Sequence, residues 1–219
     1  AAPEGSTSQP PVLPVHRRVL AAVPVHQDAD GTRHAPDYRV RARYGHESTT
    51  VDDPYRFLPT LGDVDLHLIR EGRHEELWRA LGANVRTYPS ALGDTTGTAF
   101  AVWAPNARAV RVIGDFNGWG PTHPMRSLGS TGVWELFVPG VVAGARYKYE
   151  ILGPDGSWRQ KADPLAKAAE VPPATASVVV ESRYEWSDDA WLAARAAHDP
   201  PTAPGVGYVV HVGAGRPGG

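Results

Sequence analysis

The sequence predicts a mainly β protein, in which an antiparallel β-sandwich follows a small helical and irregular N-terminal region. Past Pro89, short runs with apolar residues at every second position are separated by clusters of Gly, Pro, Asn and Asp, a pattern typical of antiparallel strands and their turns. The runs recur about every 8 to 12 residues, and no helical crossover lies between them. A sandwich is therefore favoured over a parallel α/β sheet.

Two of these runs alternate most strictly. In residues 133–138, Trp134, Leu136 and Val138 share one face, so Glu135 is expected to point into water. Residues 146–151 alternate in the same way, and we expect Tyr147 and Tyr149, like Trp134, to belong to the core. The polar face of this second run carries Arg146, Lys148 and Glu150. Further strands are predicted at residues 98–103, 110–113 and 178–180.

Helical periodicity precedes and follows the sandwich. Residues 64–69 and 77–81 each give a helix one apolar stripe, and Gly82 is suited to end the second helix because it adopts a left-handed conformation without strain. The Ala-rich residues 188–197 are predicted to form a helix with the acidic pair Asp188-Asp189 at its N-terminus. Residues 208–212 are predicted to form a buried strand.

These signals divide the chain into five segments. Residues 1–36 hold six prolines and are predicted to form a poorly ordered arm, because proline disfavours continuous helix or sheet. The other segments are a partial N-terminal module with a helical part (37–90), the β-sandwich (91–183), a helical linker (184–205) and a final segment (206–219).

The composition excludes several classes of function. With 22 Lys and Arg against 24 Asp and Glu, the chain lacks the broad basic surface that neutralises nucleic-acid phosphates. It contains no Cys, which fits a reducing compartment, and no apolar run approaches the roughly 20 residues that span a bilayer. We therefore predict a cytoplasmic protein that binds neither nucleic acid nor membrane.

Five strings of the sequence resemble a known family. They are DPYRFLPTLGDVDLHLIREGRHEELWRALGA, FAVWAPNARAVRVIGDFNGW, GVWELFVPG, YKYEILGPDGSW and QKADPLA. In this order and spacing they resemble the N-terminal region of bacterial glycogen (1,4-α-glucan) branching enzymes, over about residues 53–191. The resemblance implies a carbohydrate-binding module of the isoamylase N-terminal type (CBM48) with an immunoglobulin-like fold, and a role in glycogen biosynthesis.

The resemblance also implies a (β/α)₈ catalytic barrel in cis, which in this family transfers glucan chains by a retaining double displacement between barrel carboxylates. The tail YVVHVGAGRPGG resembles the first barrel strand, usually closer to YEVHLGSWRPG, with Val209 in place of Glu and Ala214-Gly215 in place of Ser-Trp. Residues 206–219 are therefore expected to be the start of a truncated barrel. No residue of this chain is predicted to be catalytic, and the fragment is expected to be inactive alone.

The candidate ligand site is centred on the loop Gly114-Asp115-Phe116-Asn117-Gly118-Trp119. A sugar ring has an apolar face and a hydroxyl rim, so its binding needs a flat aromatic ring with polar groups nearby. Trp119 supplies the ring, with Asn117 and Lys148 as polar partners. The alternative is that Trp119 caps the core. The resemblance implies that Trp158, after a Gly-Pro-Asp-Gly turn, is a second stacking residue, and that Ser177 stands near a position often held by Asn.

Other functions remain as alternatives or are rejected. A structural or protein-interaction sandwich without glucan binding is the main alternative, and a complete enzyme cut short is another. Gly213, Gly215 and Gly218 have the spacing of a dinucleotide fingerprint, but no helix can follow them before the chain ends. His74-Glu75-Glu76 lacks the second His of a zinc helix. No metal and no cofactor are predicted.

Overall fold

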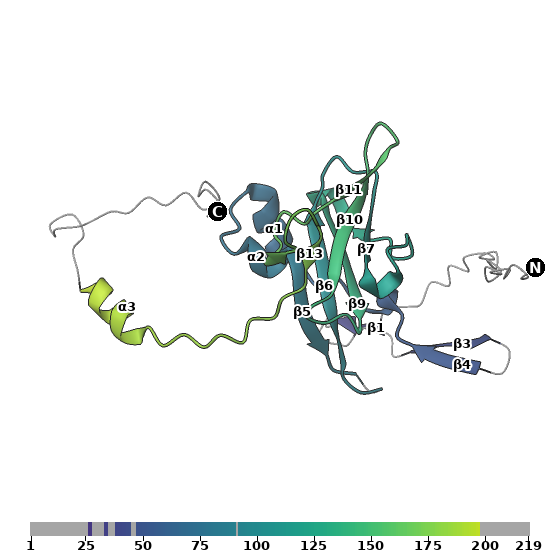
Figure 1. Cartoon of the computed structure of the whole chain (residues 1–219), viewed down its shortest axis with the longest axis horizontal. Helices are drawn as coiled ribbons and strands as arrows, with labels where there is room; N and C mark the ends of the chain where they lie inside the picture. Colours follow the sequence, from purple (N-terminus) through teal and green to yellow (C-terminus); the bar gives the residue numbers. More distant parts are fainter. Residues whose placement is uncertain (1–25, 28–32, 35–37, 45–46, 91, 198–219) are drawn as a thin grey trace, which may run out of the picture. The chain divides into compact units, whose positions relative to one another are not determined.

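The computed structural model describes residues 26–27, 33–34, 38–44, 47–90 and 92–197, drawn in colour in Figure 1. The chain divides into two compact units, Ala1–Glu181 and Ser182–Gly219. The predicted strand at 208–212, the segment 206–219 and most of the arm 1–36 lie outside the described residues.

Two antiparallel sheets form the body of the first unit. One has the strand order β5-β6-β9-β8, and the other has β10 at its centre, between β7 on one edge and both β11 and β13 on the other. The first sheet contains β5 (Gly82–Tyr88), β6 (Thr95–Trp103), β8 (Arg126–Ser127) and β9 (Val133–Pro139). The second contains β7 (Ala109–Gly114), β10 (Arg146–Leu152), β11 (Trp158–Lys161), β12 (Ala168–Ala169) and β13 (Ser177–Val178). The predicted antiparallel sandwich is confirmed.

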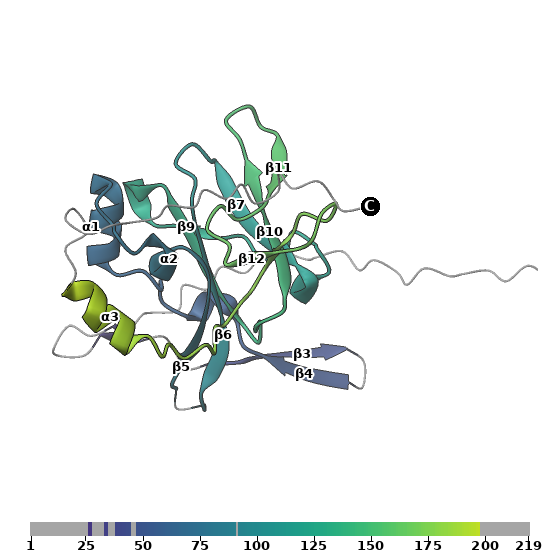
Figure 2. The same cartoon turned by 60° about the vertical axis from the view of Figure 1, so that its left-hand side comes forward.

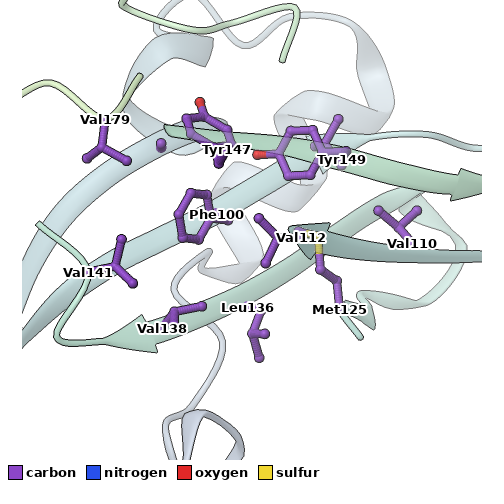
Figure 3. Packing of buried hydrophobic residues seen from close by; sticks show 12 residues of the cluster. Phe100, Val110, Val112, Met125, Leu136, Val138, Val141, Tyr147, Tyr149 and Val179 are labelled. Atoms are coloured by element: carbon purple, nitrogen blue, oxygen red, sulfur yellow. The ribbon is translucent and has the colours of Figure 1, made fainter. Parts of the chain in front are cut away.

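The main core fills the space between the two sheets. Alternate residues of each strand enter it, and Phe100 of β6 packs edge-on against Tyr147 of β10 with ring centroids 4.9 Å apart. Figure 3 shows Tyr147 and Tyr149 together with these apolar neighbours. The predicted core positions of both tyrosines are confirmed, since neither is exposed. The buried members of the cluster are Ala83, Phe100, Val102, Val110, Val112, Met125, Leu136, Val138, Val141, Tyr147, Tyr149 and Val179.

A helical layer covers the outer face of the β5-β6-β9-β8 sheet (Figure 2). It consists of η1 (Pro54–Arg56), α1 (Asp63–Glu71) and α2 (Leu77–Ala80). Leu61 and Leu81 pack there against Ala101 and Val133, and Phe57 packs against Phe137 with ring centroids 4.6 Å apart. Both faces of β6 and β9 are consequently buried.

Glu135 shows the effect of this layer on the sequence prediction. The expectation that it points into water is wrong, because its face of β9 is the face that the helical layer covers. Its carboxylate accepts from Arg126 Nε at 2.9 Å and from the backbone N–H of Thr60 at 3.4 Å. Burial raises the pKa of this carboxyl group, although Arg126 opposes the shift.

The two predicted helices before the sandwich are confirmed as α1 and α2. Gly82 follows α2 with φ +85°, and a Cβ there would lie 2.9 Å from the carbonyl oxygen of Leu165, so no other residue fits without a shift. Gly82 is also the first residue of β5. The sandwich therefore begins before the predicted boundary at residue 91. The sequence does not predict β5, because only its residues Ala83 and Val85 pack on the main core and their alternation is too weak to recognise.

Two short hairpins precede the helical layer. β1 (His26–Gln27) pairs with β2 (Arg33–His34), and β3 (Val40–Tyr44) pairs with β4 (Glu47–Val51), both antiparallel. The first pairing lies within the predicted arm 1–36 and gives four of its residues strand structure. None of the arm's prolines lies in either strand, which is why the pairing is possible.

The second unit contains α3 (Asp189–Ala196). Asp188 is its N-cap residue and Asp189 lies in its first turn, as the acidic pair predicted, because negative charge is favoured at the positive end of the helix dipole. Arg195 lies over the ring of Trp191 at 5.3 Å from its centroid.

Candidate functional site

One face of the second sheet is not covered by the helical layer. Residues directly opposite each other on paired strands point to the same side, and Glu150 of β10 is paired with Arg111 of β7 and Gln160 of β11. Two residues further along, Leu152 is paired with Trp158. We call this side the open face and define it by Arg111, Arg146, Lys148, Glu150, Trp158 and Gln160, all exposed or half-buried.

The loop after β7 is anchored at the edge of this face. Gly114 starts it, and a Cβ at that position would collide with the carbonyl oxygen of Arg146. η2 (Asp115–Asn117) follows, in which Phe116 turns inward and stacks on Phe100 with centroids 5.6 Å apart. The apolar contact of Phe116 fixes the loop to the core, while its other aromatic residue, Trp119, remains outside.

Trp119 lies in a strained backbone conformation. Its φ is +60°, and among the described residues it is the one non-glycine residue with positive φ. This conformation costs roughly 1–2 kcal/mol for a residue with a Cβ, and such strain gathers at functional positions. The side chain is 37% exposed, and its indole N–H donates to Asp115 Oδ1 at 3.2 Å. The ring is thus partly exposed to solvent, and its indole N–H is held by Asp115.

Asn117 is used within the loop. Its Oδ1 accepts from the backbone N–H of Gly114 at 2.9 Å, and its Nδ2 donates to the carbonyl oxygen of Val112 at 3.1 Å. The same Nδ2 lies 3.1 Å from Nδ1 of His123, and burial lowers the pKa of that imidazole, which favours the neutral ring as acceptor. Asn117 therefore holds the loop that carries Trp119.

Lys148 lies in the middle of the open face. Its Nζ donates to Thr175 Oγ1 at 2.8 Å, which leaves two of the three ammonium donors for other acceptors. Thr175 was missed in the sequence because it stands in a Pro- and Ala-rich loop without strand periodicity. Ser177, which the resemblance places near a position often held by Asn, is buried, and its Oγ accepts from the backbone N–H of Asp163 at 2.9 Å.

Trp158 begins β11 after the predicted turn. Gly156 of that turn has φ +81°, and Asp155 accepts from the backbone N–H of Ser157 at 3.1 Å. The Trp158 side chain is 42% exposed, and the guanidinium of Arg111 lies over its ring at 3.9 Å from the centroid. Arg111 is in turn paired through Nε with Glu150.

Contacts with alternate residues of β10 bring the predicted residues together. Arg146 pairs with Asp115, which holds Trp119, and Glu150 pairs with Arg111, which holds Trp158. Arg146 and Glu150 are four residues apart, about 13 Å along the strand, and Lys148 lies between them. Figure 1 shows β7, β10 and β11 side by side. Trp119 and Trp158 are therefore linked, through Asp115 and Arg111, to positions of β10 on either side of Lys148.

A cavity lies outside the open face. A cavity of about 520 Å³ is bounded by α1, α2, the end of β6 and residues 163–165, and none of the four predicted site residues lines it. Its polar lining includes Asp163, which accepts from the hydroxyl of Tyr147 at 2.6 Å.

In the described part of the chain, no cluster of His, Asp or Glu is arranged to hold a metal ion, and no helix has the length and apolarity needed to cross a membrane.

Comparison with known proteins identifies the class of the sandwich. Residues 80–166 match the family model of carbohydrate-binding module 48, the isoamylase N-terminal domain. The match begins just before β5 and includes β7, β10 and β11, so the sandwich with its open face is a module of this class.

The similarity extends beyond the module to a particular kind of protein. The chain is 66% identical over 185 residues to the 1,4-alpha-glucan branching enzyme GlgB of Thermobifida fusca, covering 84% of this chain and 25% of that protein. It is 59% identical over 182 residues to GlgB of Leifsonia xyli, covering 82% and 24%. The predicted resemblance to the N-terminal region of branching enzymes is confirmed, and the chain spans about a quarter of the length of these relatives.

A solved structure is more distantly similar. The pullulanase of Anoxybacillus sp. LM18-11, crystallised with maltotetraose, is 30% identical over 46% of this chain and 14% of that one, with a TM-score of 0.37.

Proposed function

We propose that the chain binds α-glucan, such as glycogen or amylose, on the open face and the adjoining loop 114–119. The single observation that carries this proposal is the link of Trp119, Lys148 and Trp158 to alternate positions of β10. Trp119 and Trp158 stack against the apolar faces of glucose rings, and Lys148 donates to hydroxyl groups between them. Asn117 contributes by holding the loop. The names of the carbohydrate-binding module and of the relatives support this ligand class.

The proposal includes the role of the module in a larger protein. We propose that it belongs to a cytoplasmic 1,4-α-glucan branching enzyme of glycogen biosynthesis and orients the polymer for a catalytic barrel in cis. Because a retaining transfer needs two positioned carboxylates, and Glu150 and Asp115 at the described site are each paired with an arginine, the chain alone is expected to have no branching activity. Incubation with amylose is expected to leave iodine staining unchanged, and a fall in staining with new α-1,6 linkages would contradict this.

Affinity electrophoresis in glycogen gels tests the ligand. The parent chain is expected to be retarded relative to a gel without glycogen, and Trp119→Ala and Trp158→Ala are each expected to bind about tenfold more weakly, if a sugar ring on an aromatic plane contributes near the lower end of the roughly 1–3 kcal/mol known for base stacking. Near-UV circular dichroism confirms that both variants are folded. Unaltered retardation in both variants, or none in the parent, would favour a structural or protein-interaction sandwich.

A further inference from the structure

The two exposed tryptophans of the site share an unusual feature: each is held by an arginine–carboxylate pair that spans β10 and a neighbouring segment. Trp119 donates its indole N–H to Asp115, which is paired with Arg146. Trp158 lies against the guanidinium of Arg111, which is paired with Glu150. Arg146 and Glu150 are both outward residues of the same strand, on either side of Lys148.

The pair at Trp158 has a definite order from the sheet outward. The side chain of Glu150 is 14% exposed and that of Arg111 is 23% exposed, whereas Trp158 is 42% exposed. The ion pair therefore lies against the sheet and the indole lies over it. One face of Trp158 rests on the planar guanidinium, a favourable cation–π contact, so a ligand would stack on the opposite face. Gln160 Nε2 donates to the second oxygen of Glu150 at 3.1 Å and restricts the carboxylate further.

The pair at Trp119 acts through the side chain of Asp115, which accepts from both Trp119 and Arg146. Asp115 Oδ2 accepts from both the backbone N–H and Nε of Arg146 at 3.0 Å, and its Oδ1 accepts from Arg146 Nη2 at 2.9 Å. These hydrogen bonds hold the pKa of Asp115 below its usual value, so the carboxylate stays ionised and remains an acceptor for the indole. Arg146 Nη1 also donates to Glu170 at 3.2 Å, which fixes the guanidinium from a second side.

We propose that Arg111 and Asp115 are positioning residues of the glucan site, which fix the ring planes of Trp158 and Trp119 before ligand arrives. The inference rests on the proposed glucan binding and deepens it, since neither residue need touch the sugar. Its physical basis is that a side chain ordered only on binding costs affinity, about 0.5–1.5 kcal/mol or two- to tenfold in Kd. A ring already ordered by its support avoids that cost.

A double-mutant cycle separates positioning from general support of the fold. Calorimetric titration with maltoheptaose is done on the parent, Arg111→Met, Trp158→Ala and the double variant. Arg111→Met is expected to weaken binding about two- to tenfold in the parent and to have no effect once Trp158 is absent. The cycle of Asp115→Asn with Trp119→Ala is expected to behave in the same way. Asp115→Asn is chosen over Asp115→Ala because it keeps the shape of the side chain, and the loop is then more readily folded.

Arg79→Met is the matched control. Arg79 of α2 pairs with Glu76, the residue before that helix, and its side chain is more exposed than those of Arg111 and Arg146, so this variant is expected to bind like the parent. Equal weakening by Arg111→Met with and without Trp158, or no weakening in the parent background, would overturn the positioning role while leaving glucan binding intact. Absence of binding by the parent would instead remove the proposed function, and the positioning role with it.

Discussion

The outer faces of the two sheets differ although each carries a pair of an arginine and a glutamate. On the β5-β6-β9-β8 sheet, Glu135 and its partner Arg126 lie under the helical layer, and the carboxylate has no exposed surface. On the other sheet, Arg111 and Glu150 lie beneath a tryptophan that remains open to solvent. A buried pair must be compensated by its own hydrogen bonds, whereas a pair on an open face is free to support a binding residue. Chain segments that precede the sandwich therefore decide which outer face stays open to solvent.

The largest expected effect is at the covered face. Phe137→Ala removes a ring that packs on Phe57 at 4.6 Å and on Tyr88 at 4.8 Å between centroids. Deleting a buried phenyl group typically costs about 3–5 kcal/mol of folding free energy, which urea denaturation measures. Glucan affinity of the folded fraction is expected to be unchanged. A loss below about 1 kcal/mol would show that the helical layer does not pack on this face as described.

A smaller effect is expected from the strained backbone at Trp119. Trp119→Gly is expected to be more stable than Trp119→Ala by about 1 kcal/mol, because glycine adopts positive φ without the Cβ penalty. Trp158 has no positive φ and lies in a strand, so Trp158→Gly is expected to be less stable than Trp158→Ala by roughly 0.5–1 kcal/mol. Both glycine variants lose their stacking plane. Thermal denaturation of the four variants shows whether Gly or Ala is the more stable replacement at each position. If the same replacement is the more stable at both positions, the prediction is wrong.

The smallest expected effect is a difference between the two sheets in how their carboxyl groups change protein stability with pH. Burial raises the pKa of Glu135, so its contribution to stability is present below its unfolded pKa and is lost as pH rises through the folded value. Hydrogen bonds from Arg146 lower the pKa of Asp115, so its contribution is present above the unfolded pKa and is lost as pH falls. The stability of the parent relative to Glu135→Gln should therefore fall with rising pH, and that relative to Asp115→Asn should rise. Urea denaturation of the three proteins from about pH 3 to pH 7 measures both differences in the free energy of unfolding. If both differences change with pH in the same direction, this expectation is wrong.

The sandwich was predictable because its strands are short and strictly alternating. The alternation of apolar and polar residues predicts the buried positions of Tyr147 and Tyr149. The helical spacing of apolar residues predicts α1 and α2. Glu135 was misplaced because alternation reports which residues share a face and not whether another layer of the fold covers that face.

The candidate site was predictable in part. Trp119, Trp158 and Lys148 were recognised from the turn chemistry, the polar strand face and the family resemblance, and they remain the proposed ligand contacts. Arg111, Asp115 and Thr175 were not recognised, because their partners come from other strands or loops 27 to 39 residues away. Such pairs depend on sheet register, which no local pattern in the chain specifies.

The most direct test of the account is a titration of ¹⁵N-labelled protein with maltoheptaose, observing the indole N–H resonances of its seven tryptophans. Tryptophan-to-phenylalanine variants assign the resonances. The account predicts that Trp119 and Trp158 shift with a common Kd, while Trp103, beside the cavity, and Trp134, whose indole donates to Ala104, do not shift. Shifts confined to Trp103, or none at Trp119 and Trp158, would contradict the claim that the open face binds glucan.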